Sequence, residues 1–215
     1  MNKYSIIIPT MWKALRSLFQ MIEQYNACPY IGEILIIKNA ASVSTLQVFE
    51  PYRKVRILND GNNLFVNPSW NLGVSQAKYE RIILANDDII LNVDFNVFMQ
   101  IIDFGLGTES IVGFSENCFY QKRTETLGNV HIHKAINGRG YGFGTFMVLM
   151  KESYRIIPKE LKVWYGDDIL YRANIPYLIE GVEVITEMRK TSRTMNLREQ
   201  HMIESKFYSR YKILK

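Results

Sequence analysis

Two pairs of acidic residues could do chemistry. Asp87 and Asp88 follow Asn86 in the stretch RIILANDDIIL, directly after an apolar segment, and Asp167 and Asp168 lie further along in WYGDDILYRANI. Carboxylate oxygens are the donors that Mg²⁺ and Mn²⁺ prefer, and carboxylates also serve as general bases. The first pair is therefore a candidate metal site, and the second is a candidate for proton transfer.

Each pair also has a structural interpretation. Asn86 and Asp87 can form an Asx-turn that leads into the next segment. Asp167 and Asp168 at the start of a helix can complement the helix dipole. The sequence has no GxGxxG after its first apolar segment and no GxxxxGK[ST] anywhere. A bound nucleotide would therefore need a divalent cation for its diphosphate, with Asp88 as ligand and Asp87 orienting a water or a sugar hydroxyl.

Strands and helices must alternate to position these acids. Apolar or β-branched segments predict strands at 4–10, 33–39, 54–60, 81–85, 110–114 and 145–150, with a last strand within 177–185. Helical spacing predicts helices at 12–26 and 70–78 and near 167–175. Strands without polar alternation, separated by helices, indicate a mostly parallel central sheet with helices on both faces, a three-layer α/β/α fold.

Polar residues gather where the first four predicted strands end. In open α/β sheets, ligands bind beyond the carboxyl ends of the strands. Any single residue there could be an ordinary turn residue, but their joint placement predicts a site. The residues are Pro9, Thr10, Trp12 and Lys13; Lys38, Asn39 and Ser42; Asn59, Asp60, Asn62 and Asn63; and Asn86, Asp87 and Asp88. The glycine-dense segment 137–144 is a further candidate for a ligand-facing loop.

Composition predicts a single cytoplasmic, soluble domain. The net charge of +5 over 215 residues is mild, and basic residues are scattered until the last thirty positions, which argues against a nucleic-acid-binding protein. Two cysteines without metal spacing indicate a reducing compartment, and no apolar run is long enough to span a membrane. The basic tail 198–215 predicts a solvated helix, with a membrane surface or a partner domain as alternatives. HIHK at 131–134 predicts an exposed strand or loop rather than a zinc site.

The residues around the first acidic pair resemble a known family. The stretch NNLFVNPSWNLGVSQAKYERIILANDDIIL, together with YSIIIPT and WYGDDIL, is similar to the nucleotide-diphospho-sugar glycosyltransferases of GT-A fold, most closely family 2. Order and spacing agree over more than twenty residues. The matching positions are Asn63, Leu64, Asn71, Gly73, Ala77 and Asn86 to Asp88.

The resemblance implies a metal-dependent, inverting transfer of a sugar from a nucleoside diphosphate, expected to be UDP, to a glycan hydroxyl. It implies Mn²⁺ or Mg²⁺ as cofactor, a nucleotide-binding half at 1–92, and a donor-sugar and acceptor half at 93–215, to which further domains could be attached. The implied residues are Pro9, Thr10, Trp12, Asn39, Asn71, Asn86 and Asp87 for the nucleotide, Asp87, Gly144 and Thr145 for the donor sugar, Asp88 for the metal, Asp168 and then Asp167 as base, and Trp164 and Tyr165 for the acceptor.

Three positions depart from the family pattern. Asn39 replaces the usual acid after the second strand, which weakens the expectation of uracil, and Asn86 stands where many members have aspartate. The segment 188–190 has cations in place of a histidine that helps the metal or diphosphate, and these cations could pair with phosphate directly. His201 lies further on, where a surface or core role is the ordinary expectation. The alternatives are a non-catalytic carbohydrate- or nucleotide-binding module and a nucleotidyltransferase, although glycines that the latter needs after the first strand are missing.

Overall fold

The computed structural model describes residues 1–40, 47–59, 62–119, 128–186 and 197–212. The strands are β1 (Tyr4–Thr10), β2 (Ile31–Lys38), β3 (Val55–Leu58), β4 (Arg81–Ala85), β5 (Ile89–Asn92), β6 (Ser110–Phe114), β7 (His131–Lys134), β8 (Phe146–Met150), β9 (Ile175–Glu180) and β10 (Glu183–Thr186). The α-helices are α1 (Leu15–Ala27), α2 (Val66–Gln76), α3 (Phe95–Gly105), α4 (Gly166–Ala173) and α6 (Arg198–Tyr211). Short 3₁₀ turns include η1 (Gln47–Phe49), η2 (Glu116–Cys118), η4 (Phe143–Thr145) and η5 (Lys151–Ser153).

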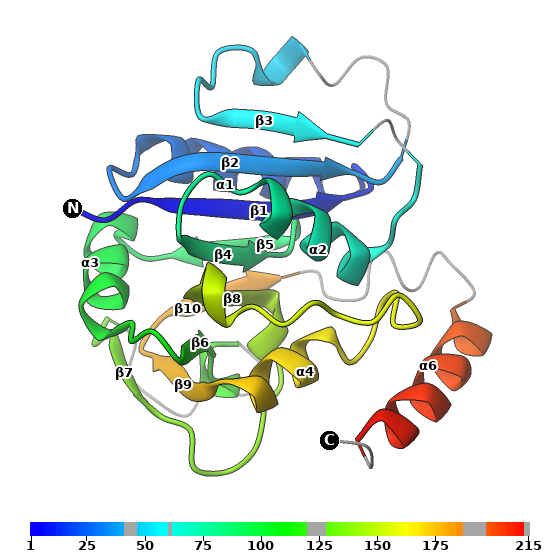
Figure 1. Ribbon diagram of the computed structural model, residues 1–215. Coiled ribbons are helices and arrows are strands. Elements are labelled where there is room, and N and C mark those ends of the chain that lie inside the picture. Colours follow the sequence, from blue (N-terminus) through cyan, green and yellow to red (C-terminus); the bar gives the residue numbers. More distant parts are fainter. Residues whose placement is uncertain (41–46, 60–61, 120–127, 187–196, 213–215) are drawn as a thin grey trace.

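One large sheet crosses the molecule, with strand order β3-β2-β1-β4-β8-β6-β9-β7, and β5 and β10 form a separate antiparallel pair (Figure 1). Parallel pairing joins β3, β2, β1 and β4 in one block, and β6 with β9 in another. β8 runs antiparallel to both β4 and β6 and links the two blocks, while β7 lies antiparallel at the edge. The predicted mostly parallel α/β sheet is confirmed.

Helices cover both faces of the large sheet. Successive side chains of a strand point to opposite faces, so Ile6 and Ile8 of β1 pack with α1 and α3, whereas Ile7 packs with α2, α4 and α6. All three isoleucines are fully buried, and each such side chain stabilises the fold by about 1.5–3 kcal/mol. This gives the predicted three-layer architecture.

The end of β1 is arranged so that a ligand can approach it. Proline is rare in central strands because it cannot donate to the ladder. β1 pairs with β4 only from Tyr4 to Ile7, whereas it pairs with β2 as far as Thr10, so Pro9 lies beyond the last β4 pair. On the sheet face above, α2 packs closely, because a Cβ at Gly73 would lie 2.3 Å from Cγ2 of Ile7. The strand end is thus held by β2 and α2.

Some elements differ from the sequence prediction. The single strand predicted within 177–185 is two strands in different sheets, because Gly181 turns the chain with φ +78°. The helix predicted from Trp70 begins at Val66, since Pro68 fits within the first turn of a helix. The third strand ends at Leu58, and α3 and β5 were not predicted.

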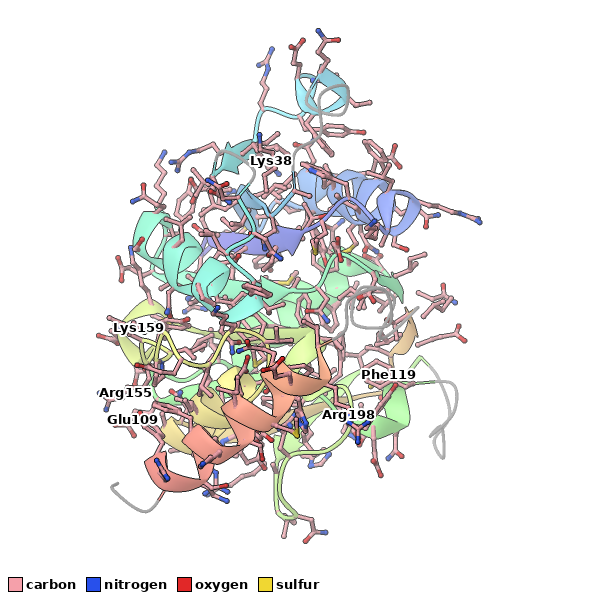
Figure 2. All side chains as sticks on the ribbon, turned by 90° about the vertical axis from the view of Figure 1, so that its right-hand side faces the viewer. Lys38, Glu109, Phe119, Arg155, Lys159 and Arg198 are labelled. Carbon is pink, nitrogen blue, oxygen red and sulfur yellow. The ribbon has the colours of Figure 1, made fainter. Side chains whose placement is uncertain are left out.

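The tail of the chain forms a helix that packs on the domain. Only Glu204 and Tyr208 of α6 are buried, so most of the helix surface is exposed, as predicted for a solvated helix. Figure 2 looks onto α6 from the side where β1, β2 and β3 end, with Arg198 at the start of this helix and Arg155 to one side of it. In the parts of the chain that the structure describes, no helix has the length and apolarity needed to cross a membrane.

Candidate functional site

The ends of β1 and β4 meet through a hydrogen bond between side chains. The hydroxyl of Thr10 donates to Oδ2 of Asp87 at 2.6 Å, and it accepts the backbone N–H of Trp12 at 2.9 Å. Thr10 is only 2% exposed. The chain leaves β1 toward β2 on one side and returns in β4 on the other, and this change of direction is where α/β sheets bind ligands. The structure therefore brings Thr10, Trp12 and Asp87 together at the expected place.

Trp12 links this point to the end of β2. Its indole N–H donates to the backbone oxygen of Ala40 at 3.1 Å, and its ring stacks on Phe49 at 5.9 Å between centroids. Trp12 has φ +60°, a conformation that non-glycine residues rarely adopt without other contacts to hold it. The indole is half-buried, so one side of it stays available beside the strand ends.

Asn39 is buried and bonded within the protein. Its side-chain N–H groups donate to Oγ of Ser69 at 2.9 Å and to the backbone oxygen of Phe65 at 3.4 Å, while its Oδ1 accepts from the backbone N–H of Leu64. Only 4% of the residue is exposed. Asn39 thus fixes the start of α2 next to the strand ends, and the base contact expected from the sequence stays a prediction.

Asn71 does not join the cluster at the strand ends. Its side-chain amide donates to the backbone oxygen of Ile157 at 2.9 Å, and its Oδ1 accepts from the N–H of Ile157 and the hydroxyl of Tyr154. One turn earlier on α2, the fully buried Asn67 donates to backbone oxygens of Leu161 and Trp164. The two asparagines hold the segment 154–166 against α2 and so position the start of α4.

The turn before β8 lies directly beside the first acidic pair. The backbone N–H of Asn86 donates to the oxygen of Thr145 at 2.9 Å, because β4 and β8 are antiparallel neighbours up to Ala85 and Phe146. The hydroxyl of Thr145 is buried and donates to the oxygen of Gly142, which has φ +82°. Thr145 therefore supports the turn, and the backbone at Gly144 and Thr145 forms the floor next to residues 86–88.

Asp167 and Asp168, in the first turn of α4, face the same turn. A Cβ at Gly144 would lie 2.4 Å from Oδ2 of Asp167, so only glycine allows this approach. The sheet and the 142–145 turn thus connect two acidic pairs that are far apart in the sequence: Asn86 is bonded to Thr145, and Gly144 packs on Asp167.

Arg139 binds both acids of the second pair. Its Nε and Nη2 donate to the two carboxylate oxygens of Asp168 at 3.1 and 3.2 Å, and its Nη1 donates to Oδ2 of Asp167 at 2.6 Å. This bidentate geometry matches a guanidinium to a carboxylate, so it fixes the orientation of Asp168. Between 20% and 29% of each of the three side chains is exposed, which leaves the group accessible from solvent.

The local charges act on Asp167 in opposite directions. Burial, which disfavours the charged form, raises the pKa of Asp167 above its ordinary value, and the neighbouring Asp168 adds to this effect. The guanidinium of Arg139 lowers the same pKa but does not cancel the rise. Arg139 itself has a raised pKa, because the two carboxylates outweigh its burial. The three groups therefore form one coupled unit.

The expected acceptor residues lie between α4 and α6. Tyr165 has φ +65° just before α4, and its ring stacks on Tyr208 with centroids 4.5 Å apart. His201 contacts Trp164 edge-on at 4.8 Å and lies 3.4 Å from the hydroxyl of Tyr165 through Nε2. The buried Glu204 accepts from the backbone N–H of Trp164 at 2.8 Å. The aromatic pair is therefore half-covered by α6, and His201 folds back onto it.

The first acidic pair has the right donors for a divalent cation. Asp87 and Asp88 are adjacent, half-buried carboxylates at the end of β4. Among the described residues, no group of three or more His, Cys, Asp or Glu side chains is placed to hold a metal ion. Two carboxylates fit Mg²⁺ or Mn²⁺ that is also bound by phosphate oxygens and water. The expected cations at 188–190, as well as Ser42 and Asp60, lie outside the described residues.

Sequence reasoning did not single out three residues that organise this site. Arg139 lies in the glycine-dense segment proposed as a ligand-facing loop, and that segment was the available signal. Asn67 lies four residues before Asn71, the spacing of neighbours on one helix face. The sequence did not indicate the role of Glu204, because two of its partners are backbone groups of Val163 and Trp164, about forty positions away in the sequence.

Comparisons with solved structures identify the fold. No protein-family model and no curated protein matches the chain. TarS 1-349 of S. aureus in complex with UDP matches with a TM-score of 0.61 and 16% identity, over 82% of this chain and 57% of that chain. GalNAc-T7 with UDP, GalNAc and Mn²⁺ matches with a TM-score of 0.62 and 11% identity, over 86% and 43%. TarS 1-349 with UDP-GlcNAc matches at 0.60 and 14%, over 82% and 55%.

These matches place the chain in the GT-A fold that the sequence resemblance predicted. Identities of 11–16% show a shared fold, not a shared activity. The chain spans 57% of the TarS 1-349 chain and 43% of the GalNAc-T7 chain.

Proposed function

We propose that the protein is a glycosyltransferase that moves a sugar from a nucleoside-diphosphate donor, UDP-linked, to a hydroxyl of a glycan acceptor, with a divalent cation and inversion at the sugar carbon. Three of the structures that it resembles were solved with UDP, with UDP-GlcNAc, and with UDP, GalNAc and Mn²⁺, which agrees with this donor class. The acids at the strand ends supply what such a reaction needs.

The observation that carries the proposal is the connection of two acidic pairs across one turn. Asp87 is bonded to Thr10 at the switch point of the sheet, and Asn86 is bonded to the 142–145 turn. Asp167 packs on the other side of that turn at Gly144. A donor with its diphosphate at the first pair would extend its sugar over the turn, where glycines allow close approach, toward the second pair.

The first pair would serve the donor. Asp88 would hold the cation together with diphosphate oxygens, and Asp87, oriented by Thr10, would accept a hydrogen bond from a ribose or sugar hydroxyl. Pro9 and Trp12 would lie along the nucleoside, with the exposed side of the indole available for contact. When bound, Mg²⁺ or Mn²⁺ supplies Lewis-acid stabilisation of the departing diphosphate.

The second pair would serve the acceptor. As the acceptor oxygen forms its bond to the anomeric carbon and the bond to the diphosphate breaks, the hydroxyl proton passes to a carboxylate, for which we propose Asp168. Arg139 holds this carboxylate in one orientation. Trp164 and Tyr165, directly before α4, would form the wall on which an acceptor sugar stacks.

Calorimetric titration of UDP with and without Mn²⁺ tests the donor half of the proposal. We expect binding that strengthens by at least about tenfold with Mn²⁺, because two carboxylates and a diphosphate repel each other without a cation. The Asp88→Ala variant should lose this metal dependence. Binding that is independent of Mn²⁺, or unchanged in Asp88→Ala, contradicts the proposal. A screen of UDP-, GDP- and dTDP-sugars by product detection then identifies the donor.

One observation favours a second candidate, a non-catalytic carbohydrate- or nucleotide-binding module on the same fold. Arg139 already occupies both carboxylate oxygens of Asp168, as in a purely structural ion pair. In such a module, the second acidic pair would stabilise the start of α4 and carry no proton. The two candidates differ in what an Asp168→Asn variant loses: turnover in an enzyme, only stability in a binding module.

A further inference from the structure

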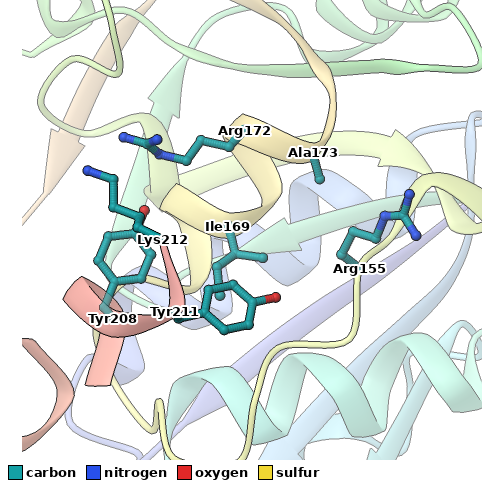
Figure 3. Close-up of a pocket in the computed structure, with 7 residues that line it drawn as sticks. All are labelled: Arg155, Ile169, Arg172, Ala173, Tyr208, Tyr211 and Lys212. Carbon is teal, nitrogen blue, oxygen red and sulfur yellow. The ribbon is translucent and has the colours of Figure 1, made fainter. Parts of the chain in front are cut away.

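A cavity of about 440 Å³ lies between α4 and the C-terminal end of α6. This volume is in the range of pockets that hold small ligands. Figure 3 shows α4 above and the last turn of α6 beside it, with Arg172 and Lys212 extending toward one end and Arg155 at the other. The residues that line it are Arg155, Ile169, Arg172, Ala173, Tyr208, Tyr211 and Lys212.

The charged residues that line this pocket are all cationic. Arg155, Arg172 and Lys212 are exposed, and within the described parts of the chain none of them forms an ion pair. No acidic residue lines the pocket. Glu109 and Glu152 line a neighbouring depression that also includes Arg155. The positive charge of Arg155 is therefore offset by nearby acids more than the charges of the other two cations are. Three cations around one concave space favour an anion there.

The remaining walls are suited to a polar organic ligand. Tyr208 is 7% exposed, and its hydroxyl lies close to the guanidinium of Arg172. The ammonium group of Lys212 lies 5.7 Å from the centre of the Tyr208 ring. Tyr211 and Ile169 add apolar surface. A ligand with an anionic group and a sugar ring fits such a mixture of cations and aromatic rings.

The pocket adjoins the proposed base. Asp168 and Arg172 are four residues apart on α4 and lie on one helix face. Burial, followed by the negative charge of Asp168, raises the pKa of Tyr208, while the charge of Arg172 lowers it, so the phenol lies close to both groups. Tyr208 also stacks on Tyr165, one of the proposed acceptor residues. The pocket therefore continues the proposed acceptor side of the site.

We propose that this pocket binds a phosphate group carried by the acceptor, so that the acceptor is a phosphorylated glycan. The inference rests on the proposed function and names its acceptor class. Two arginines favour a tetrahedral oxyanion with several acceptor oxygens, since guanidinium groups bind phosphate through paired hydrogen bonds. One phosphate in the pocket would place the adjacent unit of the acceptor near Tyr165 and Asp168.

Titration of glycerol 3-phosphate into the full chain saturated with UDP and Mn²⁺ tests the pocket, since UDP blocks binding of phosphate at the donor site. We expect saturable binding that Arg172→Glu and Lys212→Glu each weaken by about tenfold or more. Glycerol should not bind. Glucuronate, which carries a carboxylate, should bind more weakly than the phosphate ester, and equal binding would overturn the assignment to phosphate.

Arg198→Glu is the matched control. Arg198 is an exposed arginine on the same helix, about 20 Å along the axis from the pocket end of α6. The Arg198→Glu variant should leave the binding of glycerol 3-phosphate unchanged. If Arg198→Glu loses as much affinity for glycerol 3-phosphate as Arg172→Glu does, the ligand is attracted by net charge and the proposed pocket is overturned. Unchanged binding in Arg172→Glu would overturn it as well. Arg155→Glu, on the opposite wall, gives a second variant if Arg172→Glu does not fold.

The same variants show whether the phosphate pocket or the proposed glycosyltransferase function is wrong, because phosphate binding and UDP binding are measured separately. The affinity for UDP should be the same in the wild type, in Arg172→Glu and in Arg198→Glu, because neither arginine touches the first acidic pair. Phosphate binding lost in Arg172→Glu with normal UDP binding supports the pocket. If wild type binds glycerol 3-phosphate but not UDP when each is titrated alone, the donor proposal fails while the pocket stands.

Discussion

The two acidic pairs are fixed in place by different means. Asp87 is bonded to Thr10, and their strands are direct neighbours in the sheet. Asp167 and Asp168 are bonded to Arg139, which lies 28 and 29 positions earlier, in the connection between β7 and η4. A neutral hydroxyl from the adjacent strand bonds Asp87 of the first pair, whereas a guanidinium from a loop bonds both acids of the second pair.

This difference predicts different consequences of mutation. A hydrogen bond between strand ends can be lost while the strands keep their places, because the backbone ladder remains. An ion-pair unit of three partly buried charges fails as a whole, since removing one member leaves the others uncompensated. We therefore expect the largest effects on turnover at the second pair and its arginine, and the smallest effect on turnover at Thr10.

Asp168→Asn should have the largest effect on activity. Loss of the proposed base lowers turnover by about 10²–10⁴-fold, while UDP affinity stays within about twofold of wild type. Initial rates with a UDP-sugar and calorimetry with UDP measure the two quantities. Asp87→Asn is the matched comparison, since it should weaken donor binding instead. Equal loss of UDP affinity in both variants would show that the pairs do not have separate roles.

Arg139→Ala should affect both turnover and the pH dependence of stability. Burial raises the pKa of Asp167, so the folded state holds that proton more tightly than the unfolded chain. The stability from this group is present below its ordinary pKa and is lost as pH rises through the folded value. Without Arg139 the folded pKa of Asp167 rises further, so the loss extends to higher pH.

The stability difference between wild type and Arg139→Ala should therefore grow from about pH 4 to pH 7, reaching roughly 1–2 kcal/mol after allowance for solvent screening. Urea unfolding at several pH values measures it. Arg139→Lys keeps a positive charge but not the bidentate geometry, so it should recover most of the stability and little of the turnover. A difference that is constant over this pH range contradicts the coupled unit.

The contrast also explains how far the sequence predicted the site. The positions of Asp87, Thr10 and Trp12 follow from strand order, because parallel strands with apolar runs present their following residues at one edge. Arg139 could not be assigned, since the partner of a loop cation depends on the path of the loop. The prediction of a single strand within 177–185 was wrong for a similar reason. Gly181 turns the chain with a positive φ, and hydrophobic periodicity alone does not indicate such a turn.

Side-chain roles were harder to predict than positions. Asn39 and Asn71 lie on the elements expected from the sequence, yet both amides bond to protein groups. An amide has donors and an acceptor, and burial requires that both be satisfied by whatever lies nearest. For Asn71 the nearest groups belong to Ile157, which is far away in the sequence. Helix α3 was missed although Asp94 caps it with bonds to Asn96 and Val97.

Gly144→Ala should have an intermediate effect, confined to the second pair. A Cβ at this position would lie 2.4 Å from Oδ2 of Asp167, which must then move away from the turn. We expect turnover to fall by about tenfold with UDP affinity unchanged, because small displacements of catalytic groups are costly. Gly140→Ala is the control in the same loop, since its Cβ would meet Glu116 at an ordinary 3.8 Å. Equal losses in both variants would point to the loop rather than to Asp167.

Thr10→Val should have the smallest effect on turnover, at the first pair. It removes the donor to Asp87 and the acceptor for the N–H of Trp12, and the side chain keeps its shape. We expect a stability loss of about 1–3 kcal/mol and UDP binding weakened several-fold, with turnover at saturation nearly unchanged, because Asp168 is untouched. Thr10→Ser retains the hydroxyl and should bind UDP like wild type. If Thr10→Val lowers turnover at saturation as much as Gly144→Ala does, the hydrogen bond between Thr10 and Asp87 also affects the second pair, and the two pairs act as one unit.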